Sequence, residues 1–488
     1  MKNCLGILHT LVWGAPALVL ILGVGLYLSV TTGFAQITLF PRAVSGFMRK
    51  LLGKEERLED ISPFQALCTA LAATVGTGNL IGVAGALCLG GPGSIFWMWI
   101  CGILGMATKF AEVTLAQRWR VRVGQEYHGG PMYMISRGMG ETWQPMAKLY
   151  CLLGLIASFG VGNATQINAV IAAINGILGI RMEGNALPGN FLMGLALAVL
   201  VGCMLMGGAK RIGKTAEALV PLVSGCYILL CLGILLLRIP AIPAAMYAII
   251  KGAFSPAAVT GGVLGSAFSC LQVGCARGVF TNEAGMGTAS IAHAAARVRH
   301  PAEQGLMGIM EVFLDTILIC TLTALAILVS GIPIPYGQDA GGTLTINAFS
   351  AVYGDWVGIL ILLSLCCFAF ATVLGWGLYG TRCAQFLFGQ GSWKPFVLLQ
   401  SCAALLGAVT KTETIWLLAE TVNGLMAIPN LIALAYLSPE LVRLTIEYKR
   451  GGKSCRFPSM PTVVNPLPCE SSIPMHWKRK KRVKKSII

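Results

Sequence analysis

Runs of apolar residues as long as residues 66–89 recur along the whole chain, and about 20 such residues suffice for a helix to cross a membrane. Only 11% of the residues are charged and the mean hydropathy is +0.74, whereas about 25% of the residues of a soluble domain are charged. Backbone groups within lipid must pair inside the protein, which leaves helices or closed barrels. The runs lack the alternating pattern of barrel strands. The sequence therefore predicts an all-α integral membrane protein.

The apolar runs predict eleven transmembrane helices, and the charges of the loops agree with this number. If the N-terminus is outside and the C-terminus is cytoplasmic, 17 Lys and Arg residues lie inside and five outside, even without the C-terminal tail. This is the bias of the positive-inside rule. We predict a single transmembrane domain at 1–440, followed by a cytoplasmic tail at 441–488. The predicted helices are 11–38, 63–89, 93–118, 146–178, 191–208, 216–237, 261–292, 305–330, 356–388, 394–409 and 412–437.

The charge and the cysteines exclude several other classes of protein. The net charge of +16 follows mostly from the topology and does not indicate a nucleic-acid partner. The basic stretch at 478–485 is expected to lie on anionic lipid head groups, and a merely solvated tail is the alternative. The 17 cysteines include no CxxC pair and the five histidines have no metal-ligand spacing, so we expect neither a disulfide framework nor catalytic zinc. No nucleophile and base stand in a pattern that indicates an enzyme.

Two of the predicted helices are interrupted near their middle by glycines and polar residues, at 73–83 (ATVGTGNLIGV) and 274–287 (GCARGVFTNEAGMG). Five spans separate the breaks, which predicts an inverted repeat of five helices, 63–237 and 261–437, each half opening with a broken helix. A break frees backbone N–H groups that suit a carboxylate and carbonyls that suit a cation. Close packing through small residues is the alternative, but it does not require Thr77 or Asn79. We therefore interpret the breaks as a ligand site.

Six stretches of the chain carry a family pattern: TALAATVGTGN at 69–79, LGGPGSIFWMW at 89–99, GMATKFAEV at 105–113, GGPMY at 129–133, FTNEAG at 280–285 and IPNLI at 428–432. With them, nearly the whole chain resembles the alanine or glycine:cation (sodium) symporter family of secondary amino-acid transporters. The resemblance implies a leucine-transporter-like fold with one extra leading helix, at 11–38. It also implies import of a small neutral amino acid, alanine or glycine, coupled to Na⁺ by alternating access in the plasma (inner) membrane.

The resemblance also implies which residues bind the substrate. Asn79 and Gln166 have amides that can donate to a carboxylate and accept from an ammonium, although Gln166 could instead form an interhelical hydrogen bond. Thr372 and Trp376 lie one helical turn apart, and Trp376 could instead be a packing or interfacial residue. Trp376 and Phe280 around a glycine floor favour alanine, glycine or serine over leucine. The implied substrate residues are Thr77, Gly78, Asn79, Gln166, Phe280, Thr372 and Trp376.

The resemblance implies a Na⁺ site built from hard oxygen ligands, and this sequence departs from the family there. The implied ligands are Ala72, Val75, Phe368 and Thr372, the first three through carbonyls. Where the family commonly has two threonines, this chain has Ala371 and Thr372. One hydroxyl ligand is therefore missing, so a water replaces it or the cation is another one. A second departure is Thr381, where a glutamate is common, and we have no physical account of it.

Several ionisable residues fall within the predicted helices, where such groups are functional or hold helices together. Lys109 and Glu112 are three residues apart and are expected to pair. Arg277 and Glu283, which are close in the second break, are interpreted as gate or scaffold residues, and direct contact with the substrate is the alternative. Glu311 and Asp315 share one helix face and are interpreted as structural. A protonation role for Glu311 is the alternative, and it would make the protein a proton-coupled or exchange carrier. An ion channel with glycine-rich filter loops is a more distant alternative.

Overall fold

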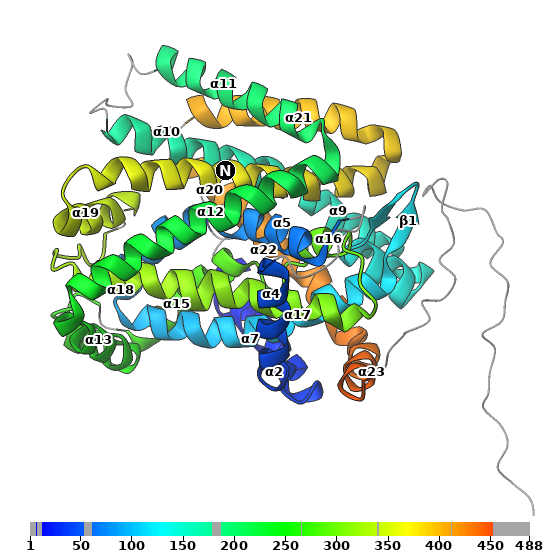
Figure 1. The fold of residues 1–488 in the computed structure, drawn as a ribbon, viewed down its shortest axis with the longest axis horizontal. Helices are drawn as coiled ribbons and strands as arrows, with labels where there is room; N and C mark the ends of the chain where they lie inside the picture. The colour runs from blue at the N-terminus through cyan, green and yellow to red at the C-terminus, as the bar shows by residue number, and fades with distance from the viewer. Residues whose placement is uncertain are drawn as a thin grey trace, which may run out of the picture.

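The computed structural model describes Gly6 and residues 12–52, 61–177, 187–264, 266–338, 341–410 and 412–451. Nearly all of this part of the chain is helical (Figure 1). Eight of its helices are long and apolar enough to cross a membrane, or nine if one bent pair counts as a single span. The basic stretch at 478–485, the first residue of the predicted leading helix and residue 178 of the fourth span lie outside the described residues.

The first half of the chain contains α2 (Ala15–Thr31), α3 (Ala35–Thr38), α4 (Phe40–Leu51), α5 (Pro63–Thr74), η1 (Gly78–Gly82), α6 (Val83–Gly90), α7 (Gly93–Trp119), β1 (Val121–Val123), β2 (Glu126–His128), α8 (Pro131–Tyr133), η2 (Met134–Met139), η3 (Glu141–Trp143), α9 (Gln144–Phe159), η4 (Gly160–Ala164), α10 (Thr165–Ile177), α11 (Leu187–Leu205) and α12 (Gly208–Leu237). The second half contains η5 (Ile239–Ala241), α13 (Ile242–Phe254), α14 (Pro256–Val259), α15 (Ala267–Asn282), α16 (Thr288–His293), α17 (Pro301–Val312), η6 (Phe313–Cys320), α18 (Thr321–Val329), α19 (Gly341–Tyr353), α20 (Val357–Phe388), η7 (Gln390–Ser392), α21 (Trp393–Val409), α22 (Thr412–Tyr436) and α23 (Ser438–Lys449).

The first break predicted from the sequence is present between α5 and α6. The Ser62 hydroxyl accepts from the N–H of Gln65 and starts α5, as an N-cap residue does. The helix ends at Thr74 because Val75 takes an extended conformation, with ψ 103°. The chain then resumes through the π-helical turn η1, and the two halves of the span meet at a bend of 53°. Residues 63–90 therefore form one span with a kink and a non-helical segment inside it.

The second predicted break is also present, so the apolar run 261–292 is not one continuous helix. α15 ends at Asn282, and Glu283 takes a left-handed conformation with φ +52°. The following glycines, Gly285 and Gly287, also have positive φ, at +96° and +78°, which glycine tolerates at no steric cost. α16 begins directly after Gly287. The backbone thus leaves the helical conformation over residues 283–287, at the place where the glycines stand.

Several elements differ from the spans predicted from hydropathy. The leading helix ends at Thr31 and not at residue 38, because Gly33 and Phe34 have positive φ and turn the chain. The predicted loops contain the short helices α13, α19 and α23 and a two-stranded hairpin, β1 and β2. Hydropathy did not indicate them because they are shorter than a membrane span. The fourth span contains a third irregular turn, η4, next to Gly160.

The helices form neighbouring groups that bring the two breaks together. α7 packs against α15 and α17, and α11 packs against α21 at the opposite edge of the molecule in Figure 1. α20 runs between these groups and contacts α5, α9, α10 and α12. The half-helix α16 contacts α5, α7 and α20. The broken helices therefore lie inside the molecule, flanked by α7 on one side and α20 on the other.

The hairpin of β1 and β2 follows α7 and docks onto the end of α20. Its strands pair antiparallel, with Val121 opposite His128. Arg382 of α20 donates to the Glu126 carboxylate at 2.6 Å and to Nε2 of His128 at 2.5 Å. Burial, and then the neighbouring guanidinium of Arg382, lowers the pKa of His128 to about 4. The docked hairpin therefore holds His128 in its neutral form.

We expect the docking of this hairpin to weaken as the pH falls from about 6.5, the ordinary pKa of histidine, toward 4. In this range an undocked His128 binds a proton that the docked one does not, so acid favours the undocked state. His128→Gln removes this dependence. The measurement is the thermal unfolding midpoint of wild type and variant in detergent between pH 4 and 7. A difference between the two midpoints that stays constant across this range would contradict the expectation.

Candidate functional site

The two breaks touch each other at glycines, which lets one backbone approach the other. A Cβ placed on Gly78 in the first break would lie 3.0 Å from the methyl of Thr281 and 3.6 Å from the ring of Phe280 in the second. A Cβ placed on Gly76 would lie 2.7 Å from the hydroxyl of Thr372 on α20. A Cβ at Gly76 would require Thr372 to shift, and a Cβ at Gly78 would require Thr281 to give way by a few tenths of an ångström. The predicted residues Gly78, Phe280 and Thr372 therefore do meet at one place.

Polar side chains surround the unwound segment at Gly76. The Thr77 hydroxyl donates to the Oε1 atom of Gln166 at 3.1 Å, and the amide nitrogen of Gln166 donates to the Val161 carbonyl at 3.1 Å. Gln166 lies directly after the irregular turn η4, and its Oε1 atom would be 3.7 Å from a Cβ on Gly76. The polar side chains of Thr77 and Gln166 are buried, and so is the apolar side chain of Val161. Gln166 thus forms an interhelical hydrogen bond and also faces the break, so both of its predicted roles fit the geometry.

Asn79 points to a partner that its sequence context does not reveal. Its amide nitrogen donates to the Asp315 carboxylate at 2.7 Å, and its Oδ1 atom accepts from the N–H of Gly76 at 2.9 Å. The side chain therefore links the first break to η6, and it ties the unwound segment to itself. The Oδ1 atom accepts one hydrogen bond here and has a second lone pair with which it could accept another.

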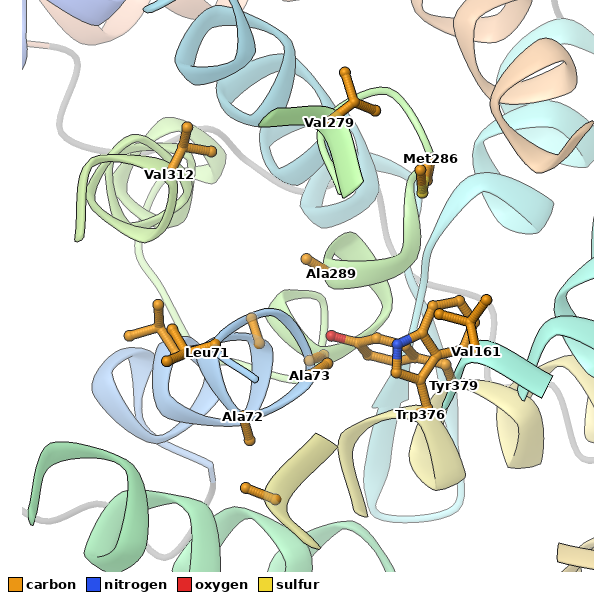
Figure 2. Close-up of a cluster of buried hydrophobic side chains, with 14 of the residues drawn as sticks. Leu71, Ala72, Ala73, Val161, Val279, Met286, Ala289, Val312, Trp376 and Tyr379 are labelled. Atoms are coloured by element: carbon orange, nitrogen blue, oxygen red, sulfur yellow. The ribbon is translucent and has the colours of Figure 1, made fainter. Parts of the chain in front are cut away.

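Trp376 joins α20 to the second break. Its indole N–H donates to the Glu283 carboxylate at 3.0 Å. Its ring covers Gly162, where an added Cβ would lie 2.3 Å from the Trp376 side chain. Figure 2 shows the ring beside Tyr379, between α5 and Val161, with the two ring centroids 5.7 Å apart. Trp376 is fully buried, so its side chain packs in the interior and does not anchor the protein at the membrane surface.

The predicted Na⁺ ligands lie at the end of α5 and on the facing turn of α20. The N–H of Gly76, which would pair with the Ala72 carbonyl in a continuous helix, donates to Asn79 instead. The Val75 carbonyl follows the last residue of α5. On α20, the Thr372 hydroxyl donates to the Phe368 carbonyl at 3.0 Å. These oxygens are the hard ligands that an alkali cation prefers, and Ala371 contributes a buried methyl group in place of a hydroxyl.

Glu112 of α7 satisfies the backbone of the second break. Its Oε1 atom accepts from the N–H groups of Gly285 and Gly287 at 2.8 and 3.0 Å, and from the Asn430 side chain at 2.8 Å. Its Oε2 atom lies 3.8 Å from the Lys109 ammonium. The predicted pair of Lys109 and Glu112 is therefore present. The capping of the break by Glu112 and Asn430 was not predicted, although both residues stand in the family motifs.

The other intramembrane charges have partners that only the fold reveals. Arg277 pairs with Glu420 of α22 at 3.7 Å, whereas Glu283 accepts from Trp376 and from the Thr288 hydroxyl, at 2.6 Å for the latter. Arg277 and Glu283 are close in sequence, but they do not form an ion pair with each other. The Glu311 carboxylate of α17 contacts the Lys109 ammonium at 3.4 Å and Nε2 of His293 at 3.0 Å.

We expect Glu112→Gln to destabilise the protein by about 1–3 kcal/mol, because a neutral amide weakens the three hydrogen bonds that the carboxylate accepts at the second break. The measurement is the free energy of unfolding in detergent. Glu141→Gln, at an exposed carboxylate, is the matched control and should leave the stability unchanged. Equal stabilities of the two variants would show that Glu112 does not hold the second break.

Comparison with known proteins places this chain in a family. The sequence profile of the sodium:alanine symporter family matches residues 1–460. An uncharacterised transporter of Haemophilus influenzae is 42% identical over 452 residues, which cover 92% of this chain and 96% of the relative. The sodium/alanine symporter AgcS of Methanococcus maripaludis is 40% identical over 443 residues, covering 90% of this chain and 95% of AgcS.

A solved structure shares the fold. MhsT, which was crystallised in complex with L-phenylalanine, aligns with a TM-score of 0.55 at 13% sequence identity and covers 80% of this chain and 99% of its own. This likeness agrees with the leucine-transporter-like architecture predicted from the sequence and speaks of the fold alone. The profile and the relatives carry the assignment: this chain belongs to the sodium:alanine symporter family.

Proposed function

We propose that the protein is a secondary active symporter that imports a small neutral amino acid, alanine or glycine, together with Na⁺ by alternating access. One observation carries the proposal: in a chain of this family, two broken helices meet at Gly78, and the side chains of Thr77, Gln166 and Thr372 converge beside them. Such a meeting point offers freed backbone groups and a few polar side chains within an apolar interior, which is what an amino-acid site needs.

The substrate would lie along the first break. Its carboxylate would approach the backbone N–H groups at Thr77 and Gly78, where η1 begins, and its ammonium would approach the carbonyl end of α5. Gln166 would bind one of the two groups, since its amide can donate or accept. Trp376 and Phe280 would bound the space for the side chain. Asn79 would bind the ligand through the second lone pair of its Oδ1 atom, which accepts one hydrogen bond, from Gly76.

The cation would bind where α5 ends and α20 faces it. Its ligands would be the carbonyls of Ala72, Val75 and Phe368 and the hydroxyl of Thr372. Ala371 offers no oxygen, so a water would fill this position of the cation shell. We infer that Na⁺ binds more weakly here than it would at a site with two adjacent threonines.

The arrangement in the membrane is part of the proposal. Eleven helices would cross the membrane, as one leading helix at 11–38 and two inverted repeats at 63–237 and 261–437. Residues 1–440 would form the transport domain, and the tail at 441–488 would lie on anionic lipid head groups on the cytoplasmic side. The N-terminus would be outside, with the protein in the plasma (inner) membrane.

A second candidate keeps the substrate and changes the driving ion. A proton-coupled or exchange carrier is favoured by one observation, a buried cluster in which Lys109 lies near both Glu112 and Glu311. Ala371 points in the same direction, since it removes an oxygen from the cation site.

Uptake of labelled alanine into proteoliposomes tests the proposal when Na⁺, K⁺ and pH gradients are imposed separately. We expect the Na⁺ gradient to drive uptake in the wild type. Ala371→Thr should lower the Na⁺ concentration for half-maximal uptake, because it restores a hydroxyl ligand. Uptake driven by protons alone would overturn the assignment of the cation. No alanine uptake under any gradient would overturn the assignment of the substrate.

The cation site has its own test at Thr372. Thr372→Val keeps the shape of the side chain and removes the hydroxyl, so we expect the half-saturating Na⁺ concentration to rise roughly tenfold, equivalent to about 1.4 kcal/mol of binding energy. Thr372→Ser keeps the hydroxyl and is the matched control. The measurement is the Na⁺ dependence of alanine uptake at saturating alanine. The same Na⁺ dependence in both variants would exclude Thr372 as a ligand.

A further inference from the structure

The carboxyl group of Asp315, in η6, lies between the two breaks and is hydrogen-bonded toward both of them. Its Oδ1 atom accepts from the amide nitrogen of Asn79, in the first break, at 2.7 Å. Its Oδ2 atom accepts from the Thr316 hydroxyl at 2.8 Å, and Thr316 in turn accepts from the side chain of Asn282 at 3.1 Å. Asn282 is the last residue of α15, where the second break begins. All four side chains are buried, so these hydrogen bonds are shielded from solvent.

A backbone group fixes the direction of these hydrogen bonds at the second break. The N–H of Ala284 donates to Oδ1 of Asn282 at 2.9 Å. Because a backbone N–H only donates, this oxygen must face Ala284, and the amide nitrogen of Asn282 must face Thr316. The Thr316 oxygen therefore accepts from Asn282, and its single hydrogen goes to Asp315. Both oxygens of Asp315 then accept, as those of a carboxylate do.

A backbone group also fixes the orientation of Asn79 at the first break. The N–H of Gly76 donates to Oδ1 of Asn79 at 2.9 Å, so this oxygen faces the unwound segment and the amide nitrogen faces Asp315. The nitrogen also lies 3.3 Å from the Asp315 carbonyl and 3.3 Å from the Cys320 sulfur. Its two hydrogens are therefore occupied. What Asn79 offers to a ligand is the second lone pair of Oδ1, which accepts and cannot donate.

A second amide beside the first break is turned in the same way. The amide nitrogen of Gln166 donates to the Val161 carbonyl, which only accepts, so Oε1 is the atom that faces the Thr77 hydroxyl. Oε1 would also lie 3.7 Å from a Cβ on Gly76. It accepts one hydrogen bond, from Thr77, and can accept a second. Asn79 and Gln166 therefore both present oxygens near Gly76, and two oxygens suit an ammonium and repel a carboxylate.

We propose that Asp315 is a positioning residue for the substrate: it holds the amide hydrogens of Asn79, so that the Asn79 oxygen binds the ammonium group of the amino acid. The inference rests on the proposed function and names the end of the substrate that Asn79 binds. The negative charge of Asp315 polarises the Asn79 amide, because buried hydrogen bonds in a chain strengthen one another. The ammonium thus gains from an acid that it does not touch. The substrate carboxylate is left to the N–H groups of Thr77 and Gly78.

The first test exchanges the two side chains in the double variant Asn79→Asp/Asp315→Asn. The amide at position 315 can then donate to the carboxylate at position 79, which still accepts from the Gly76 N–H. The measurement is binding of labelled alanine to the purified protein in detergent at saturating Na⁺. A carboxylate at position 79 suits an ammonium, so we expect a Kd within about tenfold of the wild-type value. If Asn79 faced the substrate carboxylate, two like charges would meet and binding would be lost.

The single variant Asn79→Asp is the control for the exchange. It places two carboxylates in contact without the amide that compensates them in the double variant. We therefore expect it to bind alanine more weakly than the double variant, by about tenfold or more. Equal affinities of the single and the double variant would show that Asp315 does not act through Asn79, and they would overturn the proposal.

A milder variant decides the matter if the double variant fails to fold, as judged by its thermal unfolding midpoint. Asp315→Asn keeps an oxygen for Asn79 and removes the charge. Competition against labelled alanine is measured for unlabelled alanine and for alaninamide, which keeps the ammonium and lacks the carboxylate. We expect both ligands to lose affinity by the same factor, about five- to tenfold. Asp355→Asn makes the same change in an exposed turn and should leave both affinities unchanged.

The outcomes separate this proposal from the function on which it rests. A wild-type protein that binds no alanine would overturn the proposed function first. Alanine binding in the wild type, together with loss of binding in a folded double variant, would overturn the role of Asp315 and leave the amino-acid site standing. In Asp315→Asn, a loss of affinity for alanine with alaninamide unaffected would place Asn79 at the substrate carboxylate, and it would overturn the proposal as well.

Discussion

A helix that is broken inside a membrane protein must find partners for the backbone groups that it frees, since an unpaired group there costs several kcal/mol. At the second break these partners come from α7. Glu112 accepts from the N–H groups of Gly285 and Gly287, before α16 begins. Beyond the far end of α16, Gln117 donates to the carbonyls of His293 and Ala296. α7 thus holds the half-helix at both ends.

The first break is satisfied in a different way. Asn79 accepts the Gly76 N–H within the same segment and is itself held by Asp315. The first break is therefore supported by one side chain from another element, that of Asp315. The second break is fixed by Glu112 and Gln117 of the long helix α7. The unwound segment at residues 75–78 consequently keeps carbonyls available at the end of α5. This difference is consistent with binding of the ligand and the cation at the first break.

Local signals in the sequence predicted the breaks, and contacts between distant residues could not be predicted in the same way. Glycine with threonine and asparagine inside an apolar run marks a non-helical segment wherever it occurs, and the spacing of Lys109 and Glu112 is enough to predict their pairing. The bond between Asn79 and Asp315 joins residues 236 positions apart. The partner of Arg277 is Glu420 and not the acid six residues away, because α22 passes beside α15 at that point. Only the fold brings such residues together.

One element, the span formed by α17 and η6, reaches both breaks. Glu311 is near the end of α17, and Asp315 is four residues later in η6, so the two stand on neighbouring turns of one continuous span. Glu311 faces Lys109 at the second break, while Asp315 holds Asn79 at the first. A shift of this span would therefore act on Lys109 at the second break and on Asn79 at the first and, through Asn79, on the Gly76 N–H. The span is thus a physical connection through which the two breaks can influence each other.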